Sequence, residues 1–280
     1  MIERLQKDWR NNLLSLIKGA KNEIFISSPY VTFSGVEFIK NSISESFLES
    51  GKLTFLTNLS PNNIIQGSNN PEVFHSLSSV TNDFSLWHLP KLHAKVYISD
   101  KVNSIVTSGN LTNGGLFNNF EYGVQISNGS ESQSIYKDIN EYCQLGSRID
   151  SSTLDSLISV SKSIVRTVTE KNDFVKSDLK ELLQSVENEL IKDRLNVGAV
   201  HNIFSKTILY ILEKNQGLPT EQIHIQVQQI HPDLCNDGID RIIEGKNFGK
   251  KWKHAVRTSQ QHLKKKGLIY LENDLWKLVR

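Results

Sequence analysis

Several features that mark particular protein classes are scarce or absent in this 280-residue sequence. Its only cysteines, Cys143 and Cys235, stand far apart and form no C-x-x-C pair, so we expect neither a disulfide framework nor a cysteine zinc site. No apolar run approaches the roughly 18 residues that cross a bilayer, so no membrane contact is expected. The first ten residues lack the apolar core of a signal peptide, and cytoplasmic residence is the expectation.

The composition fits a globular protein that builds its own core. Hydrophobic residues make up 38% of the chain, the mean hydropathy is −0.33, and the formal net charge is +2. A chain of this length suggests one large or two medium domains. The total charge says little about partners, because what matters is where the charges lie.

Polar residues stand at fixed offsets within an otherwise apolar, β-like stretch. His93 and Lys95 are two residues apart, Ser108 and Asn110 are again two apart, and Glu121 follows shortly after. Side chains two apart on a strand point to the same face. The stretch therefore predicts that an imidazole, an ammonium, a hydroxyl, an amide and a carboxylate converge at strand ends. A lone histidine would fit an ordinary core residue, but the joint spacing favours a site.

This set of groups suits attack on a phosphodiester. A neutral imidazole such as that of His93 can attack phosphorus and form a covalent intermediate. Lys95 and Asn110 can hold the non-bridging oxygens, where negative charge sits in the transition state. Glu121 can accept the other ring N–H of His93 and fix the orientation of that ring. None of these roles requires a metal or another cofactor, and we expect none.

At these positions the chain resembles the phospholipase D superfamily. The family pattern H-x-K-x4-D-x6-G-S-x-N is matched from His93 through Asp100 to Asn110, with Glu121 as the downstream acid. The one departure is Thr107, where the family usually has glycine, and we expect a small change in the turn. The sequence around the motif histidine, residues 92–98, is most similar to that of the nuclease and restriction-enzyme branch. The resemblance covers about residues 1–148 and implies a catalytic domain there.

Strand-like and helix-like segments alternate through this first part. The pattern predicts an α/β fold with a mixed sheet flanked by helices, which is also what the resemblance implies. A helix is predicted over residues 3–19, and strands are predicted over 91–100 and 120–126.

The rest of the chain predicts two further segments. Residues 149–196 carry two apolar helical stripes separated by Glu170, Lys171, Asp173 and Lys176, which fits a helical linker or a dimerisation segment. Residues 197–280 predict two helices, a basic helix over 249–266 and a closing hairpin. That order resembles the winged helix-turn-helix modules of restriction systems.

The basic helix carries the clearest charge signal. From Lys246 to Lys266 there are eight lysines and arginines and no acidic residue. Such a stripe favours a polyanion, although a solvated helix face is the alternative. In the third-helix position we predict DNA contacts. The candidate DNA-binding residues are Lys250, Lys251, Lys253, Arg257 and Lys264.

Three functions compete. The first is a metal-independent DNA endonuclease in restriction or anti-phage defence, in which a helicase or methyltransferase partner is left open. The second is a phospholipase D-type lipid phosphodiesterase, and the third is a DNA-binding regulator with an inactive catalytic fold. The basic C-terminal segment argues against the second and the complete motif against the third, so we predict the endonuclease. The sequence leaves open the recognised sequence and the choice between DNA and RNA.

The chain holds one complete motif, whereas the covalent mechanism uses two histidines. The other seven lack the partner residues of the motif; they are His75, His88, His201, His224, His231, His254 and His262. The resemblance implies that single-motif members pair two copies across a two-fold axis. We therefore predict a homodimer through the catalytic domain, with both His93 rings at one shared phosphate.

Overall fold

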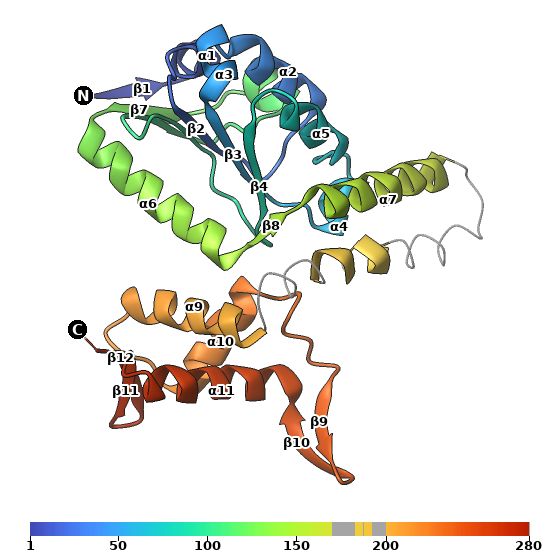
Figure 1. Ribbon diagram of the computed structural model, residues 1–280, viewed down its shortest axis with the longest axis vertical. Coiled ribbons are helices and arrows are strands. Elements are labelled where there is room, and N and C mark those ends of the chain that lie inside the picture. Colours follow the sequence, from blue (N-terminus) through green and yellow to red (C-terminus); the bar gives the residue numbers. More distant parts are fainter. Residues whose placement is uncertain (170–182, 187, 192–199, 280) are drawn as a thin grey trace. The chain divides into compact units, whose positions relative to one another are not determined.

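A computed structural model describes residues 1–169, 183–186, 188–191 and 200–279 (Figure 1). The chain divides into two compact units, Met1–Asp193 and Arg194–Arg280, and each is described by itself. Among the described residues, no helix has both the length and the apolar character needed to cross a membrane.

The first unit is built on one eight-stranded mixed sheet with the strand order β1-β7-β6-β5-β2-β3-β4-β8. The strands β2, β3 and β4 are parallel neighbours, and every other neighbouring pair is antiparallel. Their bounds are β1 Ile2–Leu5, β2 Glu23–Ser27, β3 Lys52–Thr57, β4 Asp83–His88, β5 Val96–Ser99, β6 Asn103–Thr107, β7 Gly123–Ser127 and β8 Ser147–Ile149.

Helices cover both faces of this sheet, as Figure 1 shows for α1 and α6. Alternate residues of β2 divide between the faces: Ile24 packs in the core with Leu13 of α1, while the ring of Phe25 lies 5.6 Å from that of Tyr136 in α6. This confirms the predicted α/β class with a mixed sheet between helices. The helices are α1 Arg10–Lys18, α2 Phe33–Ser42, α3 Glu45–Ser50, α4 Pro61–Ile65, α5 Glu72–Ser78, α6 Gly129–Leu145 and α7 Ser151–Thr169.

The helix predicted over residues 3–19 is wrong at its start. Ile2–Leu5 form β1, which pairs with β7 from Ile2↔Ile126 to Leu5↔Gly123, and the helix begins only at Arg10. The apolar spacing fits one helical stripe, but partners more than a hundred residues away convert its first turn into an edge strand. Trp9 is 1% exposed and its Nε1 donates to the carbonyl of Gly115 at 2.8 Å, which fixes the start of α1.

The segment predicted as a linker, 149–196, begins at the last residue of β8, and from Ser151 it is helical where it is described. The helix α7 packs against α4 and α5, and its Leu154 and Leu157 lie in the core of the first unit together with Val186 and Leu190. The described part of this apolar stripe therefore has a partner within its own unit. The charged residues between the two stripes, Glu170, Lys171, Asp173 and Lys176, lie outside the described residues. The three-segment division at 148 and 196 stays a prediction.

The second unit contains three helices and two hairpins among its described residues. Phe204, Ile208, Trp252, Val256 and Trp276 form its core. The predicted order of two helices, a basic helix and a closing hairpin is observed. A further hairpin, β9–β10, precedes the basic helix and was not predicted. The elements are α9 Val200–Glu213, α10 Thr220–Ile230, β9 Asp240–Ile243, β10 Lys246–Lys250, α11 Lys251–Lys265, β11 Ile269–Glu272 and β12 Leu275–Leu278.

Candidate active site

Three segments of the motif meet at one end of the sheet. Val96, the first residue of β5, pairs with both Ser27 of β2 and Val106 of β6, and Thr107 pairs with Gly123 of β7. The start of β5, the end of β6 and the start of β7 therefore lie side by side. Each of the five predicted site residues lies in a connection at this end.

The strands are shorter than predicted, and this corrects the expected placement of three site residues. His93 and Lys95 precede β5, and Glu121 precedes β7, so none of them is inside a strand. The backbone stays registered all the same, because the amide of Thr107 donates to the carbonyl of Lys95 at 3.2 Å. Outside the strands, side chains are not restricted to alternating faces of the sheet, so they can contact one another.

His93 and Lys95 come into direct contact. The Nζ atom of Lys95 lies 3.0 Å from Nδ1 and 3.2 Å from Nε2 of His93, and it donates to the His93 carbonyl at 2.9 Å. His93 is exposed, whereas Lys95 is 7% exposed. Burial lowers the pKa of Lys95, and the negative charge of Glu121 opposes part of that shift. The ring that could act as a nucleophile thus lies beside a cation that could hold a phosphate oxygen.

Glu121 is held by two side chains. Its Oε2 accepts a hydrogen bond from the Ser108 hydroxyl, and its Oε1 accepts one from Nδ2 of Asn119 at 3.1 Å. The same hydroxyl accepts from the amide of Tyr122 at 3.0 Å. In the part of the chain that the structure describes, no hydrogen bond joins Glu121 to His93. Orientation of the ring by Glu121 therefore stays a prediction.

Asn119 is a member of the site that sequence reasoning missed. It follows a short π-helical turn, Gly114–Asn118, and its amide fixes the carboxylate two residues later. An amide two positions before the motif acid is the signal in the sequence, and it is hard to tell from an ordinary polar turn. Asn119 is thus a positioning residue for Glu121.

Asn110 carries an unsatisfied polar atom. Its Oδ1 is buried and has no hydrogen-bond partner among the described residues. Leaving such an atom unpaired costs about 1–3 kcal/mol, and unpaired buried groups are rare enough to need a reason. The backbone of Asn110 is pressed against Gly115, where a Cβ would come within 2.4 Å of the Asn110 carbonyl oxygen. The loop therefore holds Asn110 firmly while its side chain keeps spare bonding capacity.

Asp100 has a structural role. Its carboxylate accepts from the backbone amides of Lys21, Asn22 and Glu23 at 2.9, 2.7 and 2.9 Å. It stands in the β5–β6 turn with a φ of 52°, followed by Lys101 at 59°. The aspartate of the motif thus ties this turn to the start of β2, which keeps β5 in register with β2.

Thr107 shows how the departure from the family pattern is accommodated. Its hydroxyl donates to the carbonyl of Tyr122 at 3.3 Å and accepts from the amide of Gly109 at 3.2 Å. The residue opposite is Gly123, where a Cβ would come within 2.7 Å of the Thr107 Cβ. A glycine stands on the facing strand instead, and the turn before Asn110 gains two hydrogen bonds. Ser28, directly after β2, likewise has a turn role, since its hydroxyl donates to the carbonyl of Tyr30 and accepts from the amide of Leu111.

The predicted DNA-binding residues lie on α11 or directly before it. Lys250, Lys253, Arg257 and Lys264 follow helical spacing, and Lys251, Arg257 and Lys264 are exposed. Nζ of Lys250 lies 2.8 Å from the carboxylate of Asp240, so part of its charge is already matched. Within the described ranges, no group of three or more histidines, cysteines and acids could hold a metal ion.

Comparisons with known proteins give several similar solved structures and one matching family model. No curated protein matches the chain. Among solved structures, Nuc from Salmonella typhimurium, described as a phospholipase D family member, is 17% identical over 54% of this chain and 99% of its own, with a TM-score of 0.43. NucT from Helicobacter pylori is 18% identical over 51% and 98%, with a TM-score of 0.39. Phosphatidylserine synthase from Haemophilus influenzae is 15% identical over 60% and 43%, with a TM-score of 0.41.

A family model described as "Cardiolipin synthase, PLD-like domain" matches residues 13–143. All five predicted site residues fall inside the matched part, and its α/β sheet is the one that carries them. Residues 13–143 are therefore the part of this chain that is similar to a phospholipase D-like domain.

Proposed function

We propose that this chain is a metal-independent DNA endonuclease that works through a phosphohistidine at His93. The observation that carries the proposal is the contact of the Lys95 ammonium with the His93 ring, at 3.0 and 3.2 Å. A nucleophile beside a cation for the phosphate oxygens is what the proposed chemistry requires, and the contact supports the proposal in this way. Residues 13–143 supply the phospholipase D-like fold in which such chemistry is expected.

The proposed reaction has two steps at phosphorus. A ring nitrogen of His93 forms the N–P bond while the bond from phosphorus to the leaving strand oxygen breaks. A second imidazole protonates that oxygen and then takes a proton from the water that breaks the N–P bond. Lys95 and Asn110 stabilise the charge on the non-bridging oxygens in both steps. The hydrogen bond from the Ser108 hydroxyl to the Glu121 carboxylate keeps that carboxylate next to the reacting groups.

DNA is proposed over lipid because of the second unit. Its α11 presents Lys251, Arg257 and Lys264 to solvent, and the order of its helices fits a winged helix-turn-helix. A basic helix in that position neutralises backbone phosphates. Restriction or anti-phage defence is the setting that we propose, in the cytoplasm and with a helicase or methyltransferase as the partner to look for.

A homodimer is part of the proposal, because the first unit supplies one motif histidine. Its apolar surface beside the site supports this. Phe120 and Tyr122 flank Glu121 and are 86% and 56% exposed, and Phe117 in the preceding turn is 39% exposed. Exposed aromatic groups close together mark a contact surface. A second copy packed here would bring its own His93 to the same phosphate, through an isologous interface. Such a site would cut one strand at a time.

The first prediction concerns metals. Plasmid cleavage by the purified protein should persist in excess EDTA, because Lys95 and Asn110 supply the charge stabilisation that a metal would otherwise provide. Conversion of supercoiled plasmid to nicked and linear forms measures it. Loss of cleavage in EDTA with recovery in magnesium would contradict the mechanism. Turnover of a phospholipid in place of DNA, measured in parallel, would instead support the lipid enzyme.

The second prediction concerns the basic helix. Replacing Lys250, Lys251, Lys253 and Arg257 with alanine should weaken DNA binding and flatten its dependence on salt, by about 0.9 in log–log slope for each phosphate that is no longer neutralised. Binding to a labelled duplex across a salt series measures this. A control that exchanges lysine for arginine at the same positions, and arginine for lysine, should keep the slope. An unchanged slope in the alanine variant would show that α11 is not the DNA contact.

A further inference from the structure

The hairpin β9–β10 is the least covered element of the second unit. Every residue from Arg241 to Gly249 is exposed, including Ile242 at 66%, Ile243 at 43% and Phe248 at 44%. Figure 1 shows the two strands projecting beyond the start of α11. A two-stranded ribbon with neither face packed is marginally stable on its own. Packing in the core of the unit therefore does not explain the exposed apolar side chains of this ribbon.

The base of this ribbon is nevertheless fixed. The amide of Lys251 donates to the carbonyl of Ile239 at 3.0 Å, and Nε2 of His254 lies 2.6 Å from the carbonyl of Phe248. At the tip, Glu244 and Gly245 have φ values of 50° and 76° between the paired Ile243 and Lys246. Two positive φ values in a two-residue loop form the tight turn that matches strand twist. The ribbon is thus preformed, with its outer part unpartnered.

One face of the ribbon carries two cations and two apolar groups. Ile243 and Lys246 are paired and share a face, and Arg241 lies on it by alternation. The Nζ atom of Lys246 lies 5.7 Å from the centre of the Phe248 ring, which places Phe248 with them. The acid nearest the base, Asp240, is already paired with Lys250 at 2.8 Å. Glu244 at the tip is the other acid of this hairpin, so residues 240–250 keep a net charge of +1, and the exposed face is basic and aromatic together.

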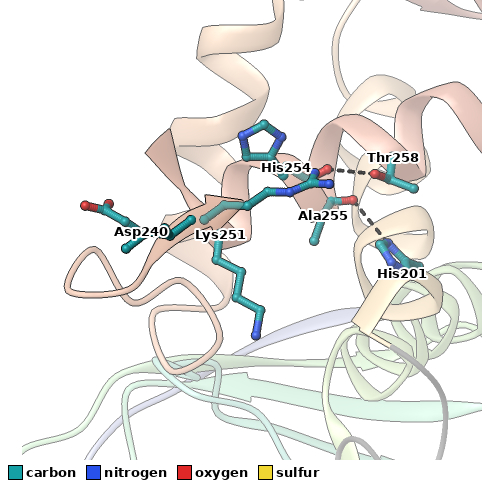
Figure 2. A pocket seen from close by; sticks show the side chains of 8 residues that line it. His201, Asp240, Lys251, His254, Ala255 and Thr258 are labelled. Carbon is teal, nitrogen blue, oxygen red and sulfur yellow. Dashed lines mark hydrogen bonds between the residues drawn. The ribbon is translucent and has the colours of Figure 1, made fainter. Parts of the chain in front are cut away.

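A pocket of about 460 Å³ opens at the base of the ribbon (Figure 2). It is lined by β9, by α11 and by His201 of α9, whose Nδ1 lies 3.3 Å from the carbonyl of Ala255. Arg241 and Lys251 are its cationic lining residues, and Asp240, whose carboxylate pairs with Lys250, is its acidic one. The basic character of the ribbon face thus continues into the pocket and onto the start of α11.

The closing hairpin β11–β12 differs in charge. Its turn residues, Asn273 and Asp274, follow Glu272, whose carboxylate pairs with Lys277 at 2.8 Å. Asp274, the second acid near this turn, is not part of that pair, and its negative charge would repel a phosphate. In a winged helix this closing hairpin would be the expected wing, yet the unit places its spare positive charge on the other hairpin.

We propose that the β9–β10 ribbon binds duplex DNA and that a DNA backbone phosphate occupies the pocket at the base of this ribbon. The β11–β12 hairpin does not contact the DNA. The inference rests on the proposed DNA binding of the second unit and names the element that performs it. A two-stranded ribbon fits the major groove of B-form DNA, whereas the major groove of duplex RNA is too narrow. Arg241 and Lys246 contact phosphates, and Phe248 packs against the sugar or base edges.

The test is binding of the full chain to a short labelled DNA duplex across a salt series. Arg241→Ala and Lys246→Ala together should weaken binding at least about tenfold at moderate salt and lower the log–log slope by about 1.8, because two phosphates are no longer neutralised. Phe248→Ala should weaken binding without changing the slope. Lys277→Ala, which removes one charge from the other hairpin, is the matched control and should bind as the unchanged protein does.

The results distinguish the assignment of the ribbon from the proposed DNA binding of the second unit. If the unchanged protein binds duplex DNA and the double variant binds equally well, the ribbon does not contact the DNA, while the proposed DNA binding of the second unit is retained. If Lys277→Ala lowers the slope by about 0.9, the loss expected for one phosphate, the closing hairpin is a contact and the assignment is overturned. If the unchanged protein binds no duplex DNA, the proposed function falls with it. An RNA duplex bound equally well, with the same loss in the double variant, would overturn insertion into the B-form groove. Unfolding temperatures of the variants should match, since all the changed side chains except the half-buried Lys277 are exposed.

Discussion

Replacing His93 with alanine is expected to lower the rate of plasmid cleavage by at least about a thousandfold, because the N–P bond of the intermediate cannot form without the ring. Affinity for DNA and the unfolding temperature should stay unchanged. His93 is exposed, so its removal leaves no core cavity, and the proposed DNA contacts lie in the second unit. Cleavage assays, duplex binding and thermal unfolding on the same preparations measure the three quantities.

A matched control is available in the same unit. His75 is an exposed histidine on α5 outside the motif, and His75→Ala should cleave at the normal rate. Rapid quenching during turnover should trap phosphohistidine in the unchanged protein and in the control variant only. Retained cleavage in His93→Ala would remove the nucleophile assignment. Loss of both cleavage and fold would be seen as a lowered unfolding temperature and would contradict the placement of His93 on the surface.

The sequence predicted the fold class well because its signals are local. Short, largely apolar runs along β2 and β3 and helical spacing in α1 and α6 are present within each segment. The pairing of β1 with β7 joins Ile2 to Ile126, and no local pattern carries that information. For the same reason, the first turn of the predicted N-terminal helix is a strand in the structure.

The β9–β10 hairpin was missed for a different physical reason. Its strands bury nothing, so the alternation of apolar and polar residues that marks a half-buried strand is absent. The Glu244–Gly245 turn is the remaining signal, and it lies beside a stretch whose pattern is dominated by charge. A strand that faces solvent on both sides leaves little trace in a pattern of burial.

In the candidate site, residue spacing predicted which groups converge but not their bonding. His93, Lys95, Ser108, Asn110 and Glu121 all lie at one end of the sheet, as the spacing indicated. The partners of each group depend on rotamers and on loops of irregular shape. The sequence assigned Glu121 to the ring of His93, whereas the described contacts hold it with Ser108 and Asn119.

The second large effect is expected when active and inactive chains are mixed. If two His93 rings serve one phosphate, refolding one part of unchanged protein with three parts of His93→Ala leaves fully active pairs as roughly one sixteenth of all dimers, given random pairing across a two-fold axis. Activity per unchanged chain should therefore fall about fourfold, since each mixed pair lacks either the nucleophile or the general acid. Cleavage by the refolded mixture, with the molecular mass measured by light scattering, tests this.

The control for that mixture is dilution with His75→Ala chains, which carry a complete motif and should leave activity per His93-bearing chain unchanged. Suppression by the His93 variant alone shows that the partner copy supplies a catalytic group. Replacing Phe120 and Tyr122 with lysine should then give monomers that retain the first-unit fold but lose cleavage, because these two aromatic side chains are 86% and 56% exposed beside Glu121. Activity that follows only the fraction of unchanged chains, or a monomer that cleaves at the full rate, would mean that one copy holds a complete site, and the general acid would have to be sought within a single chain.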